Sequence, residues 1–145
     1  MTSHYRVLED VAVADAAFEA TGDSPSELFL AASQAVIDTM ANPSTVSPSW
    51  HRNLERDAPD LSALLFDWLC EIVFLKDAEG VVFSEVIVRV EAQPDGGWRL
   101  YGTLTGGPID MTTQELRADV KAVTKHLYEV REQDGKWRAR VVLDI

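Results

Sequence analysis

The feature that most constrains the fold is a strongly apolar helix in the middle of the chain. Residues 61–79, LSALLFDWLCEIVFLKDAE, place apolar side chains at helical spacing, and Glu79-Gly80 marks the end of the pattern. An apolar face of this width has to be buried against another layer of secondary structure. The residues that form it are Leu61, Leu64, Leu65, Trp68, Leu69, Ile72 and Leu75.

Most of the other segments alternate between apolar and polar residues, as half-buried strands do. A second helix is predicted to begin at the capping residues Ser24 and Pro25 and to end before Pro43. Asp134-Gly135 is a two-residue hairpin signal between the last two strands. The predicted strands cover residues 5–9, 14–22, 49–57, 82–90, 98–107, 120–132 and 137–145.

This order of elements predicts an α+β fold in one domain of residues 1–145. Hairpin connections between the later strands favour a largely antiparallel mixed sheet. We expect the two main helices to pack on one face of that sheet. A chain of 145 residues is long enough to bury a core of its own.

The charge of the chain restricts its partners. Lys and Arg number 13 and Asp and Glu number 24, which gives a formal net charge of −11. A surface-wide interaction with RNA or DNA needs the opposite sign, and only short local pairs such as Arg138 and Arg140 supply it. We therefore expect no direct binding of nucleic acid, and instead a partner with a basic surface or a cation.

The compartment is also indicated by the sequence. Cys70 is the single cysteine, which excludes an internal disulfide, and the start MTSHYRVLED lacks the pattern of a signal peptide. No run of about 20 apolar residues indicates a membrane span. These observations predict a cytoplasmic protein without membrane contact.

Nucleotide-binding loops, zinc motifs and a nucleophile elbow are all absent from the sequence. The three histidines have no partner at metal-ligand spacing, so plain surface or strand roles are favoured for them. Cys70 lies among apolar residues of the long helix, where a thiol packs rather than reacts. These three histidines are His4, His51 and His126.

Carboxylates are the remaining candidates for chemistry. Asp67 and Glu71 are four residues apart on the long helix, either as a solvated acidic face or as a pair relieved by a nearby cation. Asp144 precedes Ile145, where the chain stops without a polar tail. With Asp15, these carboxylates suit Mg²⁺, Ca²⁺ or Mn²⁺, although charged strand ends are also common without a metal.

Several stretches together resemble the archease family. They are ATGDSPSELFLAASQAVIDTM in the first helix, FDWLCEIVFLKDAEGVVFSEV in the long helix and the strand after it, DVKAVTKH, and the ending RVVLDI. The combination covers nearly the whole chain. The resemblance implies a small acidic protein cofactor that is not itself an enzyme and that activates an RtcB-type RNA-splicing ligase. It implies that the cofactor promotes guanylylation of the ligase and multiple turnover in tRNA splicing and RNA repair.

The resemblance also implies site residues. A metal site would use Asp15, Asp144 and the terminal oxygens of Ile145, and Lys121 would take part in activating the ligase. Where the family has Leu-Glu-His-Thr-Ala-Asp, this chain has LEDVAVAD, so the His and Thr are missing and two residues are extra. Asp10 is accordingly an alternative to Asp15 as the first ligand.

Two other functions remain open at this stage. A general chaperone or modulator of an RNA-modifying enzyme, also proposed for archeases, would not require Asp144. A metal-dependent hydrolase would use an ion at Asp15 and Asp144 to activate water, but the histidines offer no obvious general base.

Overall fold

The computed structural model describes residues 3–8 and 15–145 of the chain. Two long helices and seven strands occur in the order that the sequence predicts, and a short 3₁₀ helix, η1 (Pro43–Thr45), follows the first helix. The helices are α1 (Pro25–Met40) and α2 (Leu61–Glu79). The strands are β1 (Ser3–Val7), β2 (Asp15–Gly22), β3 (Trp50–Ala58), β4 (Val81–Ala92), β5 (Trp98–Pro108), β6 (Ala122–Gln133) and β7 (Lys136–Asp144).

Local sequence accounts for the helix ends. The Ser24 side chain accepts a hydrogen bond from the Glu27 amide at 3.2 Å, and Pro25 occupies the first helical position of α1. Asp60 caps α2 through the Ala63 amide at 2.8 Å. Gly80 ends α2 in the left-handed region at φ 63°, a conformation that glycine adopts without steric cost.

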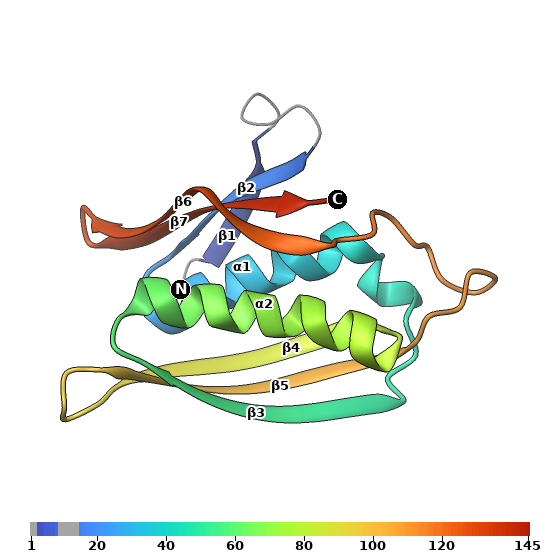
Figure 1. Ribbon diagram of the computed structural model, residues 1–145, viewed down its shortest axis with the longest axis horizontal. Coiled ribbons are helices and arrows are strands. Elements are labelled where there is room, and N and C mark those ends of the chain that lie inside the picture. Colours follow the sequence, from blue (N-terminus) through green and yellow to red (C-terminus); the bar gives the residue numbers. More distant parts are fainter. Residues whose placement is uncertain (1–2, 9–14) are drawn as a thin grey trace.

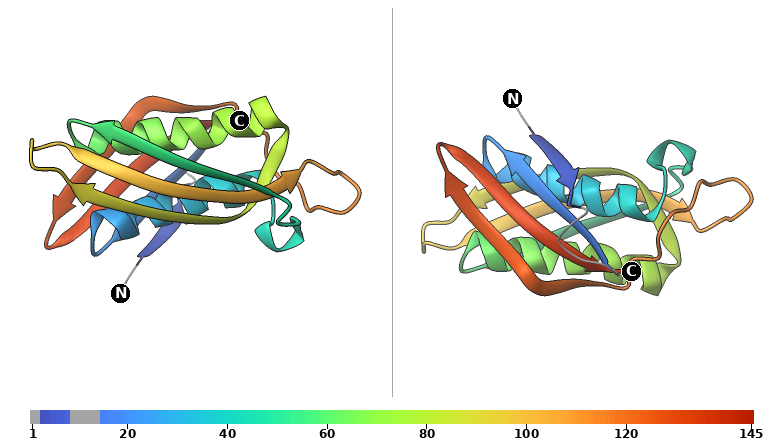
Figure 2. Two further views of the ribbon diagram at one scale, coloured as in Figure 1. Left: turned by 90° about the horizontal axis from the view of Figure 1, so that it is seen from below. Right: turned by 90° about the horizontal axis from the view of Figure 1, so that it is seen from above.

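The strands form two antiparallel sheets. The four-stranded sheet has the order β1-β2-β7-β6, and the three-stranded sheet has the order β3-β5-β4. In Figure 1 the two helices lie between the sheets, and both helices contact both of them. The two views of Figure 2 show one sheet from each side of the helical layer.

The α+β class, the two helices and the antiparallel pairing are thus confirmed, but the prediction of one sheet covered on one face was wrong. The reason lies in the helices, because α2 buries residues from the first turn to the last, including Leu61, Trp68 and Val73. A helix apolar over so wide an arc has to be covered on more than one side. A second sheet supplies that cover.

The core lies between the two sheets and centres on the indole of Trp68, which is fully buried. Its Nε1 donates a 2.7 Å hydrogen bond to the buried Ser33 hydroxyl of α1. Gly102 of β5 passes directly beneath the ring, where an added Cβ would lie 2.5 Å from Cη2 of Trp68. The strand therefore needs a residue without a side chain at this point.

Candidate functional site

The start of β2 and the end of β7 bring two carboxylates together. Asp15 lies directly opposite Asp144 in the antiparallel register of the four-stranded sheet, so both side chains project from the same face. The next pair, Ala16 and Leu143, faces the core instead. The two aspartates therefore lie on the outer face of the sheet, away from the helices. Like charges placed directly opposite each other destabilise a sheet, and a cation between them would relieve the repulsion.

Lys121 reaches the same end of the sheet from a third segment. Its main-chain amide donates a 2.8 Å hydrogen bond to the Asp144 carbonyl, and Ala122 lies opposite Asp144 on the other side of β7. Ile145 follows immediately and is 39% exposed. Four residues that the family resemblance singled out are thus close together, although they come from three separate parts of the chain. Figure 1 shows the C-terminus at this end, above the last turns of α2.

The donors at this end fit a hard divalent cation. Asp15 and Asp144 offer carboxylate oxygens, and a cation such as Mg²⁺ or Ca²⁺ completes its shell with main-chain oxygens and water. Within residues 3–8 and 15–145, no three His, Cys, Asp or Glu side chains gather as metal ligands. Zinc, which prefers histidine and cysteine, suits this donor set less well. The alternative ligand Asp10 lies outside the described residues.

Sequence reasoning missed a cluster of ion pairs beside this site. It consists of Lys76, Asp77 and Asp119, and we call it the clamp. Lys76 lies in the last turn of α2 with its side chain only 6% exposed. Its Nζ donates to Asp77 at 2.7 Å and to Asp119 at 2.6 Å. Asp119 stands two residues before Lys121, so the ion pair anchors the segment that leads to the site. The sequence places Lys76 on the apolar face, four residues after Ile72, but it does not indicate the distant partner Asp119.

Lys76 and its two aspartates interact as charged groups. Burial opposes the charged form of Lys76, but the hydrogen bonds to Asp119 and Asp77 outweigh it and raise the pKa of this lysine. The hydrogen bond from Lys76 in turn lowers the pKa of Asp119. Both groups are therefore charged at neutral pH.

The other candidates have structural roles. Arg56 of β3 reaches Glu71 at 2.9 Å and Asp67 at 3.7 Å, so it is the nearby cation that relieves this acidic pair of α2. Burial raises the pKa of the Cys70 thiol, in agreement with a packing role. The His4 ring contacts the Thr21 hydroxyl within β1 and β2.

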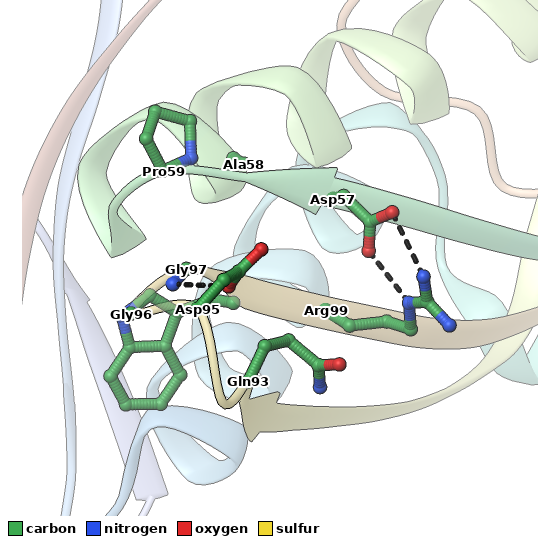
Figure 3. Close-up of a pocket in the computed structure, with 9 residues that line it drawn as sticks. Asp57, Ala58, Pro59, Gln93, Asp95, Gly96, Gly97 and Arg99 are labelled. Carbon is green, nitrogen blue, oxygen red and sulfur yellow. Dashed lines mark hydrogen bonds and ion pairs between the residues drawn. The ribbon is translucent and has the colours of Figure 1, made fainter.

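A hollow on the three-stranded sheet lies at the opposite end of the molecule, at the β4–β5 hairpin (Figure 3). Its charged groups already satisfy one another. Asp57 accepts hydrogen bonds from Arg99 at 2.6 and 3.0 Å, and these lower the pKa of Asp57. Asp95 accepts from the Gly97 amide at 2.9 Å. The hollow therefore offers a ligand few free polar groups.

The fold and the site define a class: small α+β proteins with two helices between two antiparallel sheets and an acidic pair where the first and last hairpins meet. Residues 5–145 match the family model described as the Archease protein family (MTH1598/TM1083). The chain belongs to the archease family. Protein archease of Methanothermobacter thermautotrophicus is 39% identical over 132 residues, covering 91% of this chain and 93% of the relative. Protein archease of Methanopyrus kandleri is 36% identical over 132 residues, covering 91% and 94%.

Solved structures agree with the fold. The solution structure of Methanobacterium thermoautotrophicum protein 1598 matches with a TM-score of 0.81 at 36% identity, covering 99% of this chain and 98% of that one. The crystal structure of an archease, described as a possible chaperone, from Thermotoga maritima matches with a TM-score of 0.62 at 20% identity, covering 92% and 93%. The second likeness supports the fold alone. In the part of the chain that the structure describes, neither helix has the length and apolar character needed to cross a bilayer.

Proposed function

We propose that this protein is a non-catalytic activator of an RtcB-type RNA-splicing ligase, acting in tRNA splicing or RNA repair. The observation that carries the proposal is the pairing of Asp15 with Asp144, with Lys121 bonded to the same strand end. These are the residues that the family resemblance associates with metal binding and ligase activation. The fold joins them although Asp15 is more than 100 positions from the other two in the sequence.

In this proposal the acidic end of the four-stranded sheet enters the nucleotide site of the ligase. Asp15, Asp144 and the terminal oxygens of Ile145 would hold a divalent ion there, and that ion would supply positive charge to developing negative charge on phosphate. Lys121 would place a second positive charge beside it. The formal charge of −11 favours association with the basic surface of an RNA-handling enzyme.

A ligation time course tests the proposal. Excess RNA with 2′,3′-cyclic phosphate and 5′-hydroxyl ends is mixed with limiting ligase of the same organism, GTP and Mn²⁺, with and without this protein. Product that stops near one turnover without the protein, and continues with it, is the expected result. Asp144→Asn should abolish the stimulation, whereas Asp57→Asn, the same charge change on the other sheet, should leave it intact. Identical curves with and without the wild-type protein would refute the proposal.

A chaperone is the second candidate, and it is favoured by large apolar side chains on the surface, such as Met111 at 83% and Phe74 at 60% exposure. This function predicts suppression of client aggregation that Asp144→Asn leaves unchanged. A metal-dependent hydrolase is the weakest candidate, because no histidine is found at the acidic pair among the described residues. Turnover of nucleotides by the isolated protein would revive it.

A further inference from the structure

The outer face of the four-stranded sheet carries a second pair of like charges, at the end opposite to the aspartates. Arg131 of β6 lies directly opposite Arg138 of β7. Both side chains point away from the helices, because Ala139, the next residue of β7, belongs to the core. The Arg131 and Arg138 side chains are 52% and 35% exposed. Like charges in this position repel each other.

The acidic residues nearby do not neutralise this face. Glu19 contacts Arg6 at 3.3 Å and Arg138 at 3.8 Å. Glu129 contacts Arg131 at 3.1 Å and Arg140 at 4.0 Å. Four guanidinium groups therefore share two carboxylates. An excess of positive charge results, in a protein whose formal net charge is −11.

We propose that the Arg131–Arg138 pair binds the phosphate backbone of the RNA strand that the ligase joins. The inference rests on the proposed function, since that function brings an RNA end to the aspartates. Guanidinium groups offer paired donors that match phosphate oxygens, and two of them on facing strands can hold one phosphate group between them. The net charge of the whole chain led us to expect no direct RNA binding. The charge is unevenly distributed, however, and this part of the surface is positive.

Continuity along β7 favours an RNA strand over an acidic protein. Arg138 and Asp144 are six residues apart on the same face of one strand, which is about 20 Å at the usual rise. A flexible strand with its end at the two aspartates can contact the basic pair along its length. A broad acidic protein surface laid on this face would also meet Asp15 and Asp144, and would be repelled there.

Fluorescence polarisation with a labelled single-stranded RNA at low salt tests the inference. Arg131→Gln/Arg138→Gln should weaken binding at least about fivefold and reduce the salt dependence by roughly one to two released ions. Each glutamate keeps its other arginine, so the fold is retained. The matched control is Arg89→Gln/Arg99→Gln on the three-stranded sheet, which also changes the formal charge from −11 to −11 − 2 = −13. The control should bind within about twofold of wild type, and equal weakening by both variants would overturn the inference.

Two further results separate the alternatives. Unlabelled RNA and poly-glutamate are compared as competitors of the labelled RNA. Equal displacement by both would assign the pair to an acidic protein surface and overturn the inference. If the wild-type protein binds RNA through the arginine pair but does not stimulate ligation, the proposed function is refuted and the inference stands. Stimulation by wild type, combined with unchanged RNA affinity of the Arg131→Gln/Arg138→Gln variant, refutes the inference alone.

Discussion

The outer faces of the two sheets differ in the charges that face each other across their strands. On the three-stranded sheet, directly opposite residues attract each other: Arg99 faces Asp57 on one side and Glu91 on the other. Arg89 faces Tyr101, and its guanidinium lies 4.5 Å from the ring centroid. Both arginines of this face are thus paired with carboxylates of the same sheet.

On the four-stranded sheet the facing charges attract in the middle, where Glu19 lies opposite Arg6 and Arg140, but they repel at both ends. Asp15 faces Asp144 at one end, and Arg131 faces Arg138 at the other. The same chain thus follows the rule for cross-strand pairs on one sheet and breaks it twice on the other. Natural proteins tend to break local rules at functional sites, so the facing like charges make the four-stranded sheet the candidate for function.

The largest effect on stability should come from the inner face of the three-stranded sheet. Gly102→Val would force a branched side chain into the buried Trp68 ring, and we expect it to lower the free energy of unfolding by about 2–3 kcal/mol in urea titration. The neighbouring change Thr103→Val points outward and should cost less than about 0.5 kcal/mol. Equal losses of stability in the two variants would contradict the claim that the inner face of this sheet carries the stability.

The clamp at the end of α2 joins the long helix to the segment before Lys121, so removing it tests whether that segment is held by the ion pairs. Lys76→Met should lower the free energy of unfolding by about 1 kcal/mol, since it removes the ion pairs while Asp77 and Asp119 return to water. It should also increase proteolysis within residues 109–121. Unchanged cleavage of that segment would show that the clamp does not hold it.

The pH dependence of the Lys76→Met effect follows from the two shifted groups. The lowered pKa of Asp119 gives stability that is complete above its usual 3.8 and lost as pH falls through the folded-state value. The raised pKa of Lys76 gives stability that is complete below its usual 10.5 and lost as pH rises through the folded-state value. The difference between wild type and variant should therefore be constant between these limits and shrink outside them.

The aspartate pair should behave as a repulsion. In metal-free buffer, Asp144→Asn should raise the free energy of unfolding by a few tenths of a kcal/mol to about 1 kcal/mol, because it removes one of two facing charges. The gain should shrink in high salt, which screens the repulsion. A loss of stability in Asp144→Asn would mean that other groups of the protein already compensate the repulsion between the two carboxylates.

The smallest effect should come from the same change on the other sheet, with the opposite sign. Asp57→Asn removes a carboxylate that Arg99 binds, so it should slightly lower the stability at neutral pH. Because the pKa of Asp57 is lowered, this contribution is present above its usual 3.8 and disappears as pH falls through the folded-state value. Urea midpoints of the two variants measured side by side would show whether the signs differ.

The elements themselves could be read from the sequence because their signals are local. Ser24 and Pro25 begin α1, Gly80 ends α2, and Asp134-Gly135 turns β6 into β7, as expected. The division into two sheets was not predicted, because alternation shows that a strand is half-buried but not which sheet it joins. The breadth of the apolar arc on α2 was the available clue.

The candidate site was only partly accessible to the same reasoning. The residue patterns indicated Asp15 and Asp144 as hard ligands, and the family resemblance added Lys121, but only the register of β2 against β7 shows that they meet. The clamp of Lys76 and the pair Arg131–Arg138 depend on contacts between distant segments. No local pattern encodes such contacts.

Thermal melting of the metal-free protein with added Ca²⁺, Mg²⁺ or Mn²⁺ tests the central claim most directly. A bound ion should stabilise wild type by about 2.7 kcal/mol when the free ion is 100 times its Kd. The Tm of wild type should rise with ion concentration, and that rise should be lost in Asp15→Asn, Asp144→Asn and a one-glycine extension after Ile145. An equal rise in wild type and all three variants, or no rise in wild type, would contradict the claim that the facing aspartates are kept to hold a cation.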